Sequence, residues 1–229
     1  MEPISDENLV QETVAAPATV LADAERLTSE GRFPEAIACL RSLISRRPDD
    51  VPALQELAAL CLRTGCVDEA IGHAEAVLAV RPRSVAAREL LVPALLQRGD
   101  ALRARAELET LVALAPASAD HRYRLARLFE QEGELGRASR SLHHALECAP
   151  SEELAGEIRM SMGLLDTLQL RQILERVEEE RVFNVALRQD ARAAVEARGY
   201  HLSAFGRVIL DEAARLLDRV PSHAGAFAH

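Results

Sequence analysis

Residues 51–84 read VPALQELAALCLRTGCVDEAIGHAEAVLAVRPRS, and they contain one complete unit of a pattern that recurs along the chain. Between residues 54 and 61 the apolar side chains follow the 3–4 spacing of one helix face. Gly65 interrupts this pattern, a second helical pattern fills residues 70–78, and Pro82 ends it. The stretch therefore predicts a helical hairpin.

Three kinds of residue return every 34 positions, and each has a role in such a hairpin. Glycine allows the left-handed backbone at which a helix ends and the chain reverses. Alanine early in the second helix lets the two helices approach closely, and proline ends that helix. The glycines are Gly31, Gly65, Gly99 and Gly133, the alanines are Ala36, Ala70, Ala104 and Ala138, and the prolines are Pro48, Pro82, Pro116 and Pro150. The register predicts four hairpins, over 17–50, 51–84, 85–118 and 119–152.

Two further columns complete a resemblance to the tetratricopeptide repeat, whose 34-residue period and small, glycine, alanine and proline positions this chain reproduces over about residues 17–152. The small position holds Ala24, Ala58, Val92 and Ala126, and the large position near the first helix end holds Leu27, Cys61, Leu95 and Phe129. The resemblance implies an all-α fold, a right-handed α-solenoid of four hairpins. It also implies a protein–protein interaction scaffold or adaptor that binds a peptide or helix in a concave groove.

In this family the first helix of each hairpin lines the groove. The resemblance places there Leu21, Glu25, Gln55, Leu62, Arg63, Glu89, Leu96, Asp120, Tyr123, Arg127 and Glu130. Acidic residues outnumber basic ones in this set, so a ligand with an apolar helix face and some basic groups fits it best. The groove lacks the asparagine and cationic pairs by which one branch of the family grips chaperone tails. Pro93, inside the first helix of the third hairpin, is expected to bend that helix.

After Pro150 the register fails, and residues 153–219 predict a capping helix followed by a small C-terminal helical bundle. We expect one helix over 152–163, a second through Val177 and a third from Phe183 to Val195. Ser203 is expected to cap a final helix that ends near Arg219. Residues 1–16 and 220–229 are expected to be flexible.

The stretch 183–203 also resembles a pattern, F-x-x-A-L-x-x-D-x-x-A-A-L-x-x-x-G-x-x-L-S, of leader regions of some ribosomally made, modified peptides and of a small helical subunit of ring-opening dioxygenases. This resemblance implies an alternative function. The chain would then be a modification substrate or carrier whose C-terminal helices are recognised by a processing enzyme. A plain helical bundle, built on a glycine stop and a serine cap, explains the same residues.

Composition excludes several classes of function. The formal net charge of −9 opposes general nucleic-acid binding, and the absence of lysine excludes Schiff-base chemistry and a phosphate-loop lysine. We find no catalytic motif, so we expect no enzyme, no cofactor and no metal site.

Cys61 is interpreted as a core residue, and the adjacent His143 and His144 as surface residues that do not share a metal. No signal peptide or membrane span is recognised, and a reduced cytoplasmic protein is expected.

Overall fold

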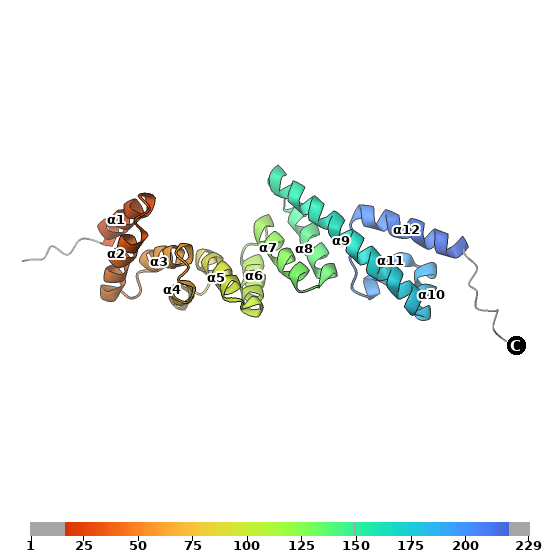
Figure 1. The fold of residues 1–229 in the computed structure, drawn as a ribbon, viewed down its shortest axis with the longest axis horizontal. Coiled ribbons are helices and arrows are strands. Elements are labelled where there is room, and N and C mark those ends of the chain that lie inside the picture. Colours follow the sequence, from red (N-terminus) through yellow and green to blue (C-terminus); the bar gives the residue numbers. More distant parts are fainter. Residues whose placement is uncertain (1–16, 149, 220–229) are drawn as a thin grey trace, which may run out of the picture. The chain divides into compact units, whose positions relative to one another are not determined.

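A computed structural model describes residues 17–148 and 150–219, and every regular element in this part of the chain is an α-helix (Figure 1). The predictions for residues 1–16 and 220–229 fall outside the described residues. The helices form two compact units, one that ends at Asp100 and one that begins at Ala101.

The first unit contains two complete hairpins and the first helix of the third. Its helices are α1 (Pro17–Ser29), α2 (Phe33–Arg46), α3 (Val51–Arg63), α4 (Val67–Val80) and α5 (Val85–Arg98). Helix α1 packs on α2 and α3 on α4, and consecutive hairpins pack through α2 with α3 and α4 with α5. Pro93 lies inside α5, which continues through it to Arg98.

The second unit contains the last hairpin and the C-terminal helices. Its helices are α6 (Ala101–Leu114), α7 (Ala119–Gln131), α8 (Leu135–Glu147), α9 (Glu152–Glu179), α10 (Arg181–Gln189), α11 (Ala191–Ala197) and α12 (Ala204–Arg219). The 28-residue α9 packs on α8 at its start and on α10 and α12 further along (Figure 1).

The repeated columns have the structural roles that their spacing predicted. The four repeat glycines have φ between 75° and 83°, in the left-handed region where glycine is favoured. The four repeat alanines are at most 2% exposed, which lets each second helix approach its neighbours. The second helices end at Arg46, Val80, Leu114 and Glu147, two or three residues before the repeat prolines.

A further column, which the sequence analysis missed, caps the first helices. The side chains of Asp50, Ser84 and Ser118 each accept a hydrogen bond from the backbone N–H three residues later. These residues are 34 positions apart, and such N-caps satisfy backbone donors that the helix itself leaves without partners. Ser151, which lies 33 positions after Ser118, caps α9 in the same way.

The C-terminal helices differ from the prediction at two points. The two helices expected over 152–177 are one continuous helix, because Gly163 in α9 keeps a negative φ and does not act as a stop. The single helix expected from Phe183 to Val195 is divided at Asp190, whose backbone is extended and whose side chain accepts from Ala193 N to start α11. The cap at Ser203 is confirmed, since its Oγ accepts from Gly206 N.

Candidate functional site

The eleven predicted groove residues lie on the first helices of the hairpins, and none of them belongs to the buried core. Leu21 and Glu25 are on α1, Gln55, Leu62 and Arg63 on α3, Glu89 and Leu96 on α5, and Asp120, Tyr123, Arg127 and Glu130 on α7. The register alternates them with core residues of the same helices. On α3, for example, Leu57 and Cys61 are fully buried while Arg63 is exposed. The groove assignment itself stays a prediction.

In the first unit these residues offer apolar and charged groups. Leu21 lines an open cavity of about 430 Å³ together with Asp50, Pro52 and Val80. Leu96 is 43% exposed, so its side chain is accessible to a ligand. The guanidinium of Arg63 lies 4.6 Å from the centre of the Phe33 ring, so a cation–π contact orients it.

On α7 the predicted groove residues already have partners within the second unit. Asp120 pairs with Arg124 at 2.9 Å, and Arg127 pairs with Glu130 at 3.4 Å. Burial raises the pKa of the Glu130 carboxyl, and Arg127 offsets part of that rise. These pairs reduce the net charge that α7 offers to a ligand.

Tyr123 is a special case on α7, because its side chain interacts with Glu157 and Ser161 of α9. Burial and the contact with Glu157 together raise the pKa of the phenol. Tyr123 therefore helps to hold α9 against the last hairpin, in addition to any role toward a ligand.

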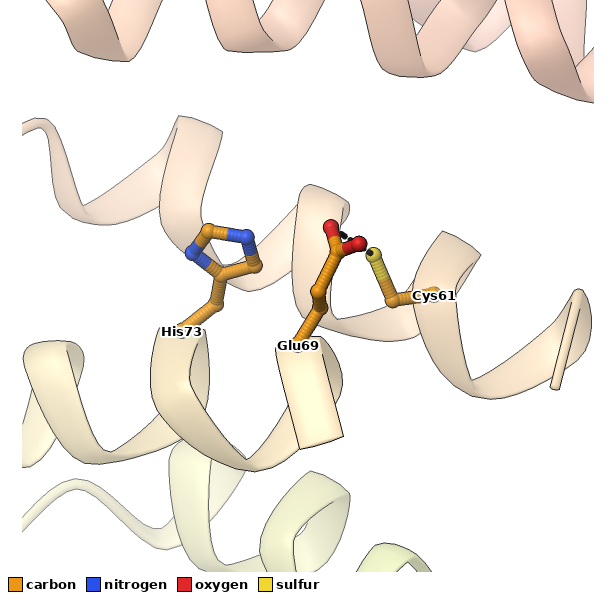
Figure 2. A group of neighbouring side chains, drawn as sticks. All are labelled: Cys61, Glu69 and His73. Atoms are coloured by element: carbon orange, nitrogen blue, oxygen red, sulfur yellow. Dashed lines mark hydrogen bonds between the residues drawn. The ribbon is translucent and has the colours of Figure 1, made fainter. Parts of the chain in front are cut away.

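A polar cluster that the sequence analysis did not anticipate lies between α3 and α4 (Figure 2). Cys61 is fully buried, and its thiol donates a hydrogen bond to Glu69 Oε2 at a sulfur–oxygen distance of 3.9 Å. Arg41 of α2 donates to the same carboxylate oxygen. His73, one turn beyond Glu69 on α4, presents its ring beside that carboxylate (Figure 2). Cys61 is thus a core residue whose sulfur faces polar groups.

Burial and the neighbouring charges together set the ionisation of this cluster. Desolvation raises the pKa of the Cys61 thiol to about 11, and the negative charge of Glu69 adds to the rise. Arg41 lowers the pKa of the Glu69 carboxyl, and burial lowers the pKa of His73. At neutral pH the cluster therefore holds a thiol, a carboxylate and a neutral imidazole. The sequence signal was available, since Glu69 and His73 are four residues apart on one helix face.

The two adjacent histidines on α8 share one partner, although neighbouring residues of a helix leave it about 100° apart. His143 Nδ1 lies 3.3 Å from Glu147 Oε1, and His144 Nδ1 lies 2.8 Å from Glu147 Oε2. The three ligand atoms lie within 4.8 Å of one another. Rotation about the side-chain bonds brings both rings to one carboxylate, and Glu147 Oε2 lies within hydrogen-bonding distance of the His144 ring.

The C-terminal pattern residues hold the second unit together. Phe183, Leu187 and Leu202 are at most 3% exposed in one hydrophobic core, and Gly199 has φ 83°. Ser203 donates its backbone N–H to Asp166 Oδ1 at 2.9 Å and its hydroxyl to Asp166 Oδ2. Asp166 is 2% exposed, and no motif in the sequence indicates its role.

A second buried polar side chain of α9 fixes the same loop. The Gln169 amide donates to His201 O at 3.1 Å and accepts from His201 N at 2.8 Å. Gln169 is fully buried, so both bonds replace contacts with water that the side chain has lost. Asp166 and Gln169 together fasten α9 to the loop between α11 and α12.

An open cavity of about 490 Å³ adjoins this loop, within the second unit. Leu146, Met162 and Phe205 contribute apolar walls, and Arg159 and Arg207 contribute positive charge. This chemistry suits an apolar side chain that lies next to an acidic group.

No helix within the described ranges is long and apolar enough to span a membrane.

Solved structures with a similar fold include several helical-repeat proteins. A MamA fragment from Desulfovibrio magneticus RS-1 superposes with a TM-score of 0.58 at 19% identity, covering 88% of this chain and 94% of that one. The crystal structure of TTC0263, described as a thermophilic TPR protein in Thermus thermophilus, gives a TM-score of 0.51 at 23% identity, covering 79% and 99%. These likenesses concern the fold. No curated protein matches the sequence.

The comparison with protein-family models assigns the chain to a family. Two models described as tetratricopeptide repeat match residues 27–92 and 89–152, and together they span more than half of the chain. The matched residues contain the 34-residue columns whose structural roles are described above. The predicted all-α class, helical hairpins followed by a C-terminal helical bundle, is confirmed. On the family models and the solved folds together, this chain belongs to the tetratricopeptide-repeat proteins.

Proposed function

We propose that this chain is a non-enzymatic scaffold for protein–protein interaction, and that it binds a peptide or a helix of another protein along the first helices of its hairpins. The observation that carries the proposal is the position of the eleven groove residues. They share helices with core residues, yet none of them is buried. Apart from Tyr123, which also contacts α9, these side chains lie outside the hairpin core, so their identity can suit a ligand. Solenoid repeats generally use such extended surfaces for binding.

The chemistry of these residues indicates the class of ligand. Leu62 and Leu96 supply apolar anchors in the first unit. The exposed acidic groups Glu25 and Glu89 outnumber the exposed Arg63 there. On α7 the acidic residues pair with arginines of the same helix. A helix with one apolar face and flanking basic groups therefore complements this surface best.

Leu96→Glu tests the proposal with a matched control. We expect it to weaken the affinity for a partner purified from the native cell by at least about tenfold, because a buried anchor at an interface is replaced by a carboxylate. Leu102→Glu is the control, since Leu102 is 71% exposed but lies on α6, a second helix. Isothermal titration calorimetry measures both. Equal affinities of the Leu96 variant and the unmodified protein would refute the groove assignment.

The alternative function, a modification substrate or carrier, depends on the pattern over residues 183–203. Its Phe183, Leu187, Gly199, Leu202 and Ser203 all serve packing, a turn or a cap in this structure. These roles favour the helical-bundle interpretation of the pattern. An intact mass equal to that of the unmodified chain, for protein purified from its native cell, would exclude a covalently modified carrier.

A further inference from the structure

Three side chains with different ligand atoms converge between α3 and α4. Glu69 and His73 are four residues apart on α4, so their side chains leave the same helix face on successive turns. Cys61 reaches toward them from α3 (Figure 2). One ligand atom from each of the three lies within 4.8 Å of the other two. Such a juxtaposition of thiol, imidazole and carboxylate is not needed for hairpin packing.

The set of ligand atoms defines the class of ion that would fit. Sulfur, imidazole nitrogen and carboxylate oxygen are the three ligand types that proteins offer to zinc, at about 2.3, 2.0 and 2.1 Å. Hard cations such as Mg²⁺ and Ca²⁺ prefer oxygen ligands alone. Glu69 has 46% of its side chain exposed, so it can rotate to close the remaining distance.

Burial of the Cys61 sulfur, which raises the pKa of its thiol, opposes a cation, and so does Arg41. The Arg41 guanidinium donates a hydrogen bond to Glu69 Oε2, but 52% of the Arg41 side chain is exposed. An ion pair this accessible to solvent contributes little and is readily exchanged. The entering ion would displace Arg41 from Glu69 and the proton from the Cys61 thiol. A thiolate and a carboxylate would then balance the two charges of the ion.

We propose that Cys61, Glu69 and His73 form a binding site for a divalent cation of the zinc class, with the fourth coordination position open to water or to an external ligand. The site joins α3 to α4 within the second hairpin. It is independent of the predicted groove residues, and its failure would leave the proposed function untouched.

His143, His144 and Glu147 provide a comparison within the same chain. Their ligand atoms are equally close together, but the cluster contains no sulfur, and the three side chains are 42–57% exposed. A weakly bound ion at this position would have only nitrogen and oxygen ligands. Spectroscopy that detects a metal–sulfur bond therefore separates the two clusters.

Cobalt titration of the metal-free, full-length protein in a thiol-free reductant tests the site. We expect one equivalent of Co²⁺ to produce a near-ultraviolet thiolate-to-cobalt charge-transfer band and visible bands of a tetrahedral ion, and Zn²⁺ to displace them. Cys61→Ala should abolish the charge-transfer band. His73→Gln and Glu69→Gln should each weaken binding by at least about tenfold, since even indirect partners of a metal cost that much.

Two sets of variants guard against misfolding and against other cysteines. Arg41→Gln removes the competing cation and should tighten binding by up to about fivefold, which an unfolded variant would not do. Cys66→Ser, Cys148→Ser and His143→Gln/His144→Gln should leave the band unchanged. Absence of the band from the unmodified protein, its persistence in Cys61→Ala, or its loss in Cys66→Ser would each overturn the proposal.

Discussion

Gly136→Ala is expected to destabilise the second unit by about 3 kcal/mol, because the added methyl group has no room. Gly136 lies in the first turn of α8, and a Cβ there would overlap the carbonyl oxygen of Gly199 and lie 3.0 Å from its carbonyl carbon. Both are backbone atoms, so no side-chain rotation relieves the overlap. The loop after α11 would have to move away from α8. Thermal unfolding followed by circular dichroism measures the loss.

Gly72→Ala is the matched control for this substitution. Gly72 lies inside α4, keeps a helical backbone, and has open space around its Cβ position. Alanine there should stabilise the helix by up to about 1 kcal/mol. A similar effect of both substitutions on the melting temperature would show that the approach of Gly199 to α8 is not a real constraint.

Asp166→Ala is expected to cost about 2–3 kcal/mol in the same unit. The Asp166 carboxylate is 2% exposed and accepts both the backbone N–H and the hydroxyl of Ser203. Alanine would leave that N–H without its acceptor in a half-buried position and would open a cavity beside Gly206. Urea unfolding measures the change.

Asp166→Asn separates the hydrogen bonds from the charge. An asparagine carbonyl can accept from Ser203 N, and its amide can donate to Ser203 Oγ, so the geometry is kept. We expect this variant to lose less than half of the free energy that Asp166→Ala loses. Equal losses would mean that the carboxylate acts through its charge, and would contradict the hydrogen-bond interpretation.

Repeat spacing predicted the hairpins well because each column has one physical requirement. A left-handed turn needs glycine, a close helix contact needs alanine, and a helix end tolerates proline. The capping residues Asp50, Ser84 and Ser118 share that spacing and could have been recognised too. The break at Asp190 also had a local signal, since aspartate is a preferred N-cap.

Other features depend on contacts between distant residues, which a single sequence does not reveal. Asp166 and Ser203 are 37 positions apart, and Gly136 and Gly199 are further apart still. The cluster around Cys61 could not be predicted from the sequence for a related reason. The helical register correctly placed Cys61 in the core, but a core position does not say which atom the sulfur faces. The groove residues could be predicted only by their positions in the repeat, because hairpin packing does not determine which side chain stands at each position.

Site-specific photocrosslinking in the native cell tests the central claim most directly. A photoreactive phenylalanine analogue replaces Leu62 or Leu96 on the first helices, or Leu102 on α6 as the control. The scaffold account predicts that the same partner protein is crosslinked from positions 62 and 96 and not from position 102. Crosslinks from position 102 alone, or none from positions 62 and 96 in cells where the folded protein is present, would contradict binding along the first helices.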